Sequence, residues 1–363
     1  MKQRRLLTGL VVAVLVGTAG ACDSGGGGTG DQWTAPAPGQ AAALLDFAEG
    51  GRDAALRDVA FYGFGGVTAP GGMTTGPDGS VYGLGDKAVR LKPDRTVSTV
   101  EGATKAGTST SGLVALPDGS LVVGGAGQVK RIAPDGTVSV LAGAAGAART
   151  PGAPVPASVP AVGFHFAGPS PFGVGPDGTI LIGDRDVLWG LKNGTLKQLY
   201  RTTGKSADGQ LLHIGRDSAV DATGTAYISP EVPDRFPGRL SDLLAVRANG
   251  SLSKLQLPAA IDGMPGAPAA LKVRWLTGDG ANGIFAQVYD ASGNNGAVLH
   301  LHSGKADVIA HEASDVESTK PCRIPQPVDA LRLPCALPEA MTYRSGSLIL
   351  GGLADYILQI RVT

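Results

Sequence analysis

Aromatic residues, cysteines and an excess of charge of either sign are all scarce in this sequence. Aromatic residues make up 5% of the 363 residues, three residues are cysteine, and 31 basic residues balance 31 acidic ones. Because balanced charge leaves no basic surface for phosphate groups, we expect no nucleic-acid partner. Glycine and proline are abundant instead, at 56 and 25 residues. We therefore expect frequent turns and no long helices.

The first 21 residues have the pattern of an export signal. Three basic residues precede an apolar stretch over residues 6–16, and small residues continue to Ala21. The apolar stretch is too short to span a membrane as a helix and has the length of a signal-peptide core. We therefore expect residues 1–21 to be a signal peptide.

The cleavage point leaves two outcomes open. The sequence AGA before Cys22 suits an ordinary signal peptidase, which would give a freely secreted protein. The sequence AGAC also resembles a bacterial lipobox, in which the cysteine is lipidated, although such boxes usually carry leucine where Ala19 stands. The glycine-rich residues 23–30 favour the lipoprotein, because they have the composition of a flexible tether. Since two acyl chains anchor a protein stably, we expect palmitate on Cys22 and a location on the outer face of the bacterial cytoplasmic membrane.

The cysteine count agrees with this interpretation. Cys322 and Cys335 can form a disulfide bond in an oxidising compartment, which leaves Cys22 as the odd cysteine. Lipidation gives that exported cysteine a role. The spacing of Cys322 and Cys335 does not match a zinc motif, so we predict a disulfide bond.

A pattern centred on Pro-Asp-Gly recurs along the chain. It reads TTGPDGSVYGLG at residues 74–85, VALPDGSLVVGG at 114–125 and GVGPDGTILIGD at 173–184. Proline presets the backbone for a tight turn, and glycine takes the left-handed position that closes the turn. Aliphatic and β-branched residues flank each turn, so each copy is predicted to be a hairpin of two antiparallel strands.

A second turn follows each hairpin, as in APDG at residues 133–136, between two further strands. Together these elements make a four-stranded antiparallel blade. Degenerate hairpins occur at residues 218–229, 274–288 and 340–352. We therefore predict an all-β fold, a six-bladed β-propeller over residues 55–363, with residues 22–54 as lipid anchor and flexible linker.

The last predicted blade lacks a fourth strand of its own. Residues 356–363 have the pattern of a third strand, and the sequence ends there. Residues 55–64 have the pattern of a strand that precedes the first blade. We expect this N-terminal strand to complete the last blade, because an unpaired edge would otherwise be exposed.

Residues 141–184 carry a longer motif. An AG pair after a fourth strand is followed by a connection rich in Gly, Ala and Pro, and then by P-x-G-V-x-P-D-G-x-x-x-I-x-D. This motif resembles the NHL family of six-bladed propellers, and the resemblance extends over most of residues 70–363. It implies a fold, which can carry many functions. It also implies an aspartate after the second strand of a blade, for which the candidates are Asp184 and Asp186, with Asp86 and Asp355 in similar positions.

The longest predicted connections all fall on one face of the disc. They are residues 143–169, 230–240, 257–270, 290–296 and 311–334. Long loops on a rigid scaffold often carry function. We therefore predict that this face, with the mouth of the central channel, is the binding surface.

The candidate ligand contacts lie on that face. His165, between two phenylalanines, is either a ligand contact or part of a packed loop anchor. Arg185 stands among the aspartates that follow second strands, and these carboxylates either cap turns or hold a hard cation such as calcium. The aspartates are Asp86, Asp184, Asp186 and Asp355. We favour the packing and capping interpretations, and no other cofactor is indicated.

His300 and His302 are two residues apart on a predicted strand, so they point to the same side, as a metal-binding pair would. In register with the first blade they occupy the positions of Arg90 and Lys92. We therefore predict a solvated or inter-blade role for them and no metal site. No nucleophile elbow, zinc-binding helix or phosphate-binding loop occurs, and no catalytic residue is predicted.

These observations predict a monomeric, non-catalytic recognition module that binds a protein, peptide or glycan at the bacterial cell surface. The alternative is a propeller enzyme, a lyase or hydrolase. Its site at the channel mouth would then use His165, Arg185 and the aspartates, with or without a metal ion.

The lipid anchor gives a direct test. Labelled palmitate should enter the wild-type protein, and the Cys22→Ala variant should be released into the medium because it has no acyl chains to hold it. Both quantities can be followed in cultures by autoradiography and immunoblotting. Equal release of the two proteins would contradict the lipoprotein prediction.

Overall fold

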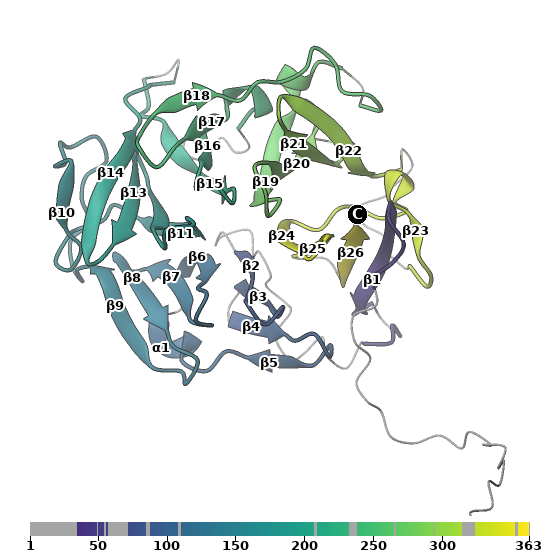
Figure 1. The fold of residues 1–363 in the computed structure, drawn as a ribbon, viewed down its shortest axis with the longest axis horizontal. Helices are drawn as coiled ribbons and strands as arrows, with labels where there is room; N and C mark the ends of the chain where they lie inside the picture. Colours follow the sequence, from purple (N-terminus) through teal and green to yellow (C-terminus); the bar gives the residue numbers. More distant parts are fainter. Residues whose placement is uncertain are drawn as a thin grey trace, which may run out of the picture.

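The computed structural model describes most of the chain from residue 35 onward. The described residues are 35–48, 50–53, 56, 72–84, 88–107, 110–206, 209–231, 238–264, 266–293, 295–313, 324–352 and 355–362. Their strands form six antiparallel sheets arranged in a ring (Figure 1). The fold is therefore a six-bladed β-propeller, which confirms the prediction from the repeats.

Each blade contains four antiparallel strands. Blade one has β2 (Met73–Thr75), β3 (Val81–Leu84), β4 (Ala88–Leu91) and β5 (Val97–Thr99). Blade two has β6 (Thr110–Ala115), β7 (Leu121–Gly125), β8 (Gln128–Ile132) and β9 (Val138–Gly143). Blade three has β11 (Pro169–Val174), β12 (Ile180–Asp184), β13 (Val187–Lys192) and β14 (Thr195–Arg201).

The second half of the ring follows the same plan. Blade four has β15 (His213–Val220), β16 (Ala226–Glu231), β17 (Leu244–Val246) and β18 (Leu252–Lys254). Blade five has β19 (Lys272–Gly278), β20 (Ile284–Tyr289), β21 (Ala297–His302) and β22 (Lys305–His311). Blade six has β24 (Ala340–Arg344), β25 (Ser347–Gly351), β26 (Tyr356–Arg361) and, from the N-terminal end of the described chain, β1 (Gln40–Asp46).

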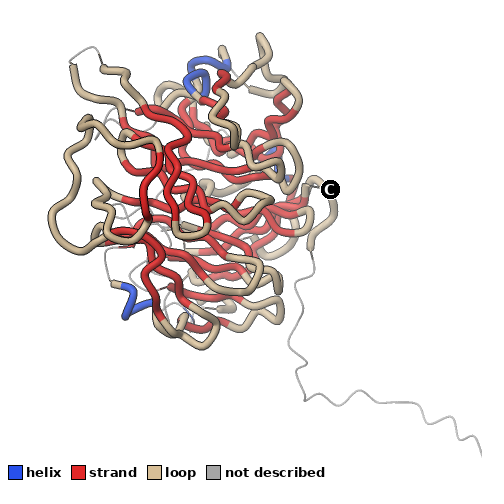
Figure 2. The backbone as a smooth tube through the Cα atoms, turned by 60° about the vertical axis from the view of Figure 1, so that its left-hand side comes forward, coloured by secondary structure: helices blue, strands red, loops and turns tan. Residues whose placement is uncertain are grey.

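The first strand of each blade lines the central channel, and the fourth lies toward the perimeter (Figure 1). The middle strands are apolar on both faces because a neighbouring blade covers each face, and β12 is buried along its whole length. Helix is scarce in the described residues: there is α1 (Ala103–Ala106), with short 3-10 turns η2 (Leu240–Asp242), η3 (Pro268–Ala270) and η4 (Ala330–Arg332) (Figure 2). Within the same residues, no helix has the length and apolar character needed to cross a membrane.

The blade topology gives the disc two different faces. Turns between first and second strands, and between third and fourth strands, lie on one side, which we call the turn face. Connections between second and third strands, and between successive blades, lie on the other side, which we call the loop face. The longest connections, such as residues 144–168 between β9 and β11, belong to the loop face.

The ring closes between the two ends of the described chain. β1 pairs antiparallel with β26, with Ala41 opposite Ile360, and Phe47 N–H donates to the carbonyl of Asp355 at 2.7 Å. Closure by an N-terminal strand is therefore confirmed, but its expected location was wrong: the strand is β1 and not residues 55–64. Of those residues only Leu56 is described. β1 lies within residues 22–54, which were expected to be anchor and linker. The strand was not predicted because its sequence QAAALLD lacks the alternation of a half-buried strand.

Two long connections also provide extra edge strands. β10 (Ser158–Pro160) precedes blade three and pairs with its outer strand β14, and β23 (Val328–Asp329) precedes blade six and pairs with β1. These pairings cover the outer edges of two blades, which limits edge-to-edge association with other chains. Part of the length of these connections therefore serves the edges of the disc.

The aspartate of the Pro-Asp-Gly turn stabilises that turn directly. Its Oδ1 accepts the backbone N–H two residues later, at 3.0 Å from Ser80 to Asp78, 2.9 Å from Ser120 to Asp118 and 3.1 Å from Thr179 to Asp177. Blades four and five keep the device without the Pro, through Asp221 and Asp279. The recurrence of aspartate thus follows from turn capping.

The same carboxylate pairs with a cation on the third strand. Asp78 pairs with Arg90 in blade one, Asp118 with Arg131 in blade two, and Asp177 with Lys192 at 2.7 Å in blade three. We call these three contacts the turn–cation pairs; all of them lie on the turn face. In blade five, His300 stands at the corresponding position, with its Nε2 at 2.9 Å from Asp279 Oδ2.

Acid should weaken the turn–cation pairs. Hydrogen bonds from Lys192 and Thr179 lower the pKa of the exposed Asp177 from its ordinary 3.8 to about 2. A carboxylate with a lowered folded-state pKa stabilises the fold above its ordinary pKa, and this contribution is lost as the pH falls through the folded-state value. The Tm difference between wild type and Asp177→Asn should therefore shrink between pH 4.5 and about pH 2, as measured by thermal melts.

The control is Asp262→Asn, at an exposed residue of a loop-face connection. Its Tm difference from wild type should be small at every pH. A difference for Asp177→Asn that does not change with pH would contradict the prediction.

Candidate functional site

The central channel contains a cavity of about 340 Å³, lined by the first strands of all six blades. About half of its lining residues are glycine, alanine, valine or leucine, and hydroxyl groups come from Thr74, Thr75, Ser170, Ser218, Thr277, Thr342 and Tyr343. Thr75 Oγ1 lies 3.2 Å from Thr342 Oγ1 and donates to the carbonyl of Tyr343 at 3.0 Å, so these hydroxyls join blades one and six.

The channel offers little acid–base chemistry. The carboxylates in its described lining are Asp217 and Asp221, and this lining includes no histidine, lysine or arginine. Asp221 Oδ1 already accepts the N–H of Thr223 at 2.9 Å as a turn cap. A hard cation such as calcium requires several oxygen ligands converging on one point. In the part of the chain that the structure describes, no such group of carboxylates or histidines forms in the channel.

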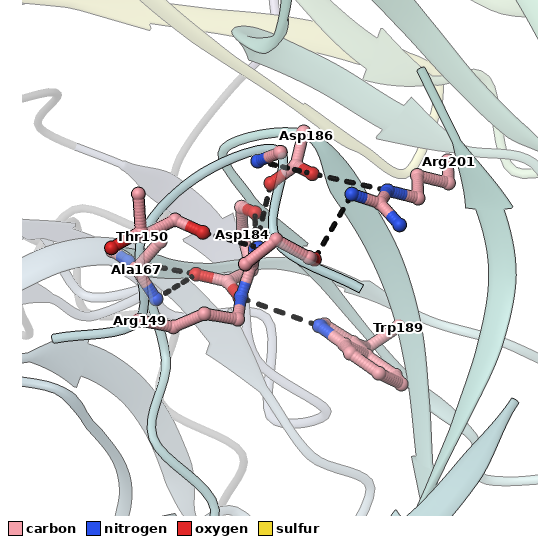
Figure 3. Close-up of polar contacts among 10 residues, drawn as sticks. Arg149, Thr150, Ala167, Asp184, Asp186, Trp189 and Arg201 are labelled. Carbon is pink, nitrogen blue, oxygen red and sulfur yellow. Dashed lines mark hydrogen bonds and ion pairs between the residues drawn. The ribbon is translucent and has the colours of Figure 1, made fainter. Parts of the chain in front are cut away.

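A denser group of charges lies inside blade three (Figure 3). Asp184 ends β12, Asp186 precedes β13, and the side chains of both are fully buried. Arg185 between them has a φ of 57°, in the left-handed region, which a two-residue turn requires. The turn aims both carboxylates at the connection of residues 144–168.

Asp184 is saturated with donors. Its Oδ1 accepts the N–H groups of Ala167 and Gly168, each at 2.7 Å. Its Oδ2 accepts from Arg149 Nη2 at 3.1 Å and from the indole N–H of Trp189 at 3.4 Å. Burial raises the pKa of Asp184, and the charge of Arg149 opposes that effect.

Asp186 is held in the same way. Its Oδ1 accepts from Arg149 at 2.8 Å, and its Oδ2 accepts from Gly152 N–H at 3.0 Å and from Arg201 Nε at 3.2 Å. Burial raises the pKa of Asp186, but the hydrogen bonds from Arg149 and Gly152 outweigh burial and place the pKa below its ordinary value. We call Arg149, Asp184, Asp186 and Arg201 the buried ion cluster.

The buried ion cluster fastens a long loop to its blade. Arg149, Gly152, Ala167 and Gly168 all belong to the connection before β11, and Arg201 Nη2 also donates to the carbonyl of Ala153 at 3.0 Å. Asp184 accepts four hydrogen bonds and Asp186 accepts three, and Arg149 places a positive charge against both carboxylates. In this geometry the two aspartates hold the loop through Arg149 and through backbone N–H groups, a role that differs from the expected capping of their own turn.

His165 lies on the outer side of the same loop. Its side chain is exposed, whereas Phe164 and Phe166 on either side pack inward, with ring centroids 5.0 Å apart and edge-on to each other. Phe164 also meets Trp189 edge-on at 5.1 Å. The phenylalanines are therefore the loop anchor, and the histidine is presented to solvent.

The other predicted residues are spread around the molecule. Arg185 is exposed at its turn in blade three, and Asp355 lies beside the first residue of β26 in blade six. Cys335 is buried and disulfide-bonded. Asp86 and Cys322 lie outside the described residues, so the pairing of Cys322 with Cys335 stays a prediction.

Sequence reasoning missed Arg149 and Arg201. Arg149 is an isolated charged residue in a connection rich in Gly, Ala and Pro, next to a blade whose turn carries two aspartates. A lone cation in such a loop was the available signal, because a buried carboxylate pair needs a nearby positive charge.

The fold defines the protein as a six-bladed β-propeller, and comparisons agree at that level. No family model matches the sequence, and no curated protein does. Among solved structures, this chain resembles a Bacteroides thetaiotaomicron protein of unknown function (9% identity, TM-score 0.50, 78% of this chain and 67% of that chain).

Two further solved structures are similar in fold. A gluconolactonase from Xanthomonas campestris has 14% identity and a TM-score of 0.48, over 80% of this chain and 84% of that chain. A calcium-binding regucalcin from Agrobacterium tumefaciens has 11% identity and a TM-score of 0.45, over 80% of this chain and 89% of that chain. At these identities the likeness concerns the fold alone.

Removal of Arg149 should release the loop. The Arg149→Leu variant leaves two buried carboxylates without their shared cation, which should cost about 3–5 kcal/mol of unfolding free energy. Chemical denaturation measures this loss, and hydrogen exchange over residues 144–168 should increase.

Arg185→Leu is the matched control, since Arg185 lies between the same two aspartates but is exposed. Its effect should stay within about 0.5 kcal/mol. Similar losses in the two variants would show that burial of Arg149 is not the cause.

Proposed function

We propose that this protein is an exported, lipid-anchored propeller that binds a protein, peptide or glycan at the bacterial cell surface without catalysing a reaction. The observation that carries the proposal is the buried ion cluster, which fastens the connection of residues 144–168 to blade three. A binding loop that is ordered before it meets its partner loses less conformational entropy on binding.

The outer side of that loop has the character of a contact surface. Val162 is 68% exposed, and His165, three residues later, is exposed as well. Single exposed apolar residues are common on proteins. Here, however, the apolar side chain lies on a loop whose inner side is fixed by ion pairs and phenylalanine packing.

The path of the chain supports an orientation in which the loop face points away from the membrane. β1 is the fourth strand of blade six, so it begins on the side where β26 ends, and Gly39 N–H donates to the carbonyl of Arg361 at 2.9 Å. That side is the turn face. A tether from a lipidated Cys22 would therefore reach the turn face, with the loop face directed away from the membrane.

The enzyme alternative has less support from the geometry. Its candidate aspartates in blade three are buried and hydrogen-bonded to arginines and loop N–H groups, and His165 lies on the exterior of a loop. The described channel lining contributes two carboxylates and no basic residue. General acid–base catalysis needs groups positioned together within reach of a substrate.

The proposal predicts different effects for the loop of residues 144–168 and for a surface site on another blade. The Val162→Glu substitution should abolish capture of the partner in crosslinking and pull-down from the native cell envelope, because a charge would be desolvated in the interface. Leu252→Glu is the matched control: Leu252 is 49% exposed and begins β18 beside a turn of the turn face.

Both variants change a surface residue, so both should fold normally in thermal melts. Quantitative mass spectrometry of the captured proteins compares them with wild type. Loss of the partner with Leu252→Glu but not with Val162→Glu would assign recognition to a surface other than the loop of residues 144–168 and refute the proposal.

A further inference from the structure

Two histidines and an aspartate, which are residue types that can ligate metals, lie together on the turn face of blade five. His300 and His302 project from one side of β21, and their rings stack with centroids 4.4 Å apart. Asp307 on β22 is the register partner of His300, and its Oδ2 lies 2.8 Å from His302 Nε2. One ligand atom from each of the three side chains lies within 4.8 Å of the others.

We propose that His300, His302 and Asp307 form a binding site for a divalent transition-metal ion of the zinc type. Two imidazole nitrogens and one carboxylate oxygen are ligands that Zn²⁺ accepts, at bond lengths of roughly 2.0–2.2 Å. Calcium and magnesium prefer oxygen ligands, so this donor set favours a transition metal.

Comparison among the blades separates this site from an ordinary turn–cation pair. The position of His300 opposite the second strand holds Arg90 in blade one and Arg131 in blade two. A guanidinium cannot ligate a metal, whereas a neutral imidazole can. Blade five thus has His300, a possible metal ligand, where blades one and two have an arginine, and it has a second imidazole at His302.

Asp279 supplies an outer-shell partner for the site. Its Oδ2 contacts His300 Nε2 at 2.9 Å, and its Oδ1 caps the turn through Ala281 N–H at 2.7 Å. A carboxylate on a metal-binding histidine fixes the ring orientation and strengthens the ligand. Phe285 stacks on the His300 ring with centroids 4.5 Å apart and restrains the same ring.

The site has room to adjust around an ion. The side chains of His300, His302 and Asp307 are 22%, 30% and 60% exposed, so each can move by a fraction of an ångström without disturbing the core. Three protein ligands leave a coordination position for water or for a ligand from another molecule. Because it lies on the turn face, the site is separate from the proposed recognition surface.

Zinc titration of the protein without a histidine tag tests the proposal. Isothermal titration calorimetry with Zn²⁺ near neutral pH should show one ion bound per chain, and zinc should raise the Tm by mass action. The decisive variant is His300→Arg, which rebuilds the pair of blades one and two. In blade one the Arg90 guanidinium lies 5.7 Å from the ring centroid of Tyr82, and Phe285 holds the corresponding place opposite residue 300.

His300→Arg should therefore keep the wild-type Tm without zinc and bind zinc more than about tenfold more weakly. His302→Gln should weaken binding likewise and keeps the test valid if the arginine variant folds poorly. His165→Gln, at an exposed histidine far from the site in sequence, should bind as wild type does. Wild-type protein that binds no zinc, or equal zinc affinity in wild type, His300→Arg and His302→Gln, would overturn the proposal.

Discussion

The pairing of β1 with β26 is the contact on which the ring depends. A propeller blade cannot bury both faces of its sheet alone, so each blade needs two neighbours and the ring must close. β1 supplies the outer strand of the last blade, and its Leu44 and Leu45 are buried against Ile357 of β26 and residues of blade one. One strand therefore completes a sheet, joins the two ends of the chain and seals the boundary between the last and first blades.

Local turn chemistry made much of this fold predictable. The Pro-Asp-Gly turns mark hairpins because φ, ψ and side-chain capping are set by neighbouring residues, and the number of hairpins then gives the number of blades. The closing strand escaped the same reasoning. QAAALLD has no alternating pattern, because Leu44 and Leu45 are both buried where the register of β1 shifts against β26. Its pairing is decided by a strand more than 300 residues away in sequence.

The candidate site, like the fold, could be predicted from the sequence only in part. Asp184 and Asp186 stand out in the sequence because they follow a predictable strand, but their donors do not. Arg149 lies in an irregular connection, and its approach to the two carboxylates depends on how that connection folds back over the blade. Burial of a carboxylate without a cation would be costly, so the aspartates and Arg149 are coupled physically although no local pattern links them.

The added strands β10 and β23 divide the perimeter of the disc. They cover the outer strands of blades three and six, which stand at opposite ends of one diameter in a ring of six. Along that diameter, β10 pairs with residues 195–197 of β14, and β23 pairs with Gln40 and Ala41 of β1. Strand pairing between neighbouring molecules is therefore hindered more at these two blades than at blades two and four, where Val140 and Leu252 are exposed on outer strands. The perimeter of the disc is therefore not uniform: two opposite blades carry an added edge strand, and this difference affects how two copies can pack side by side.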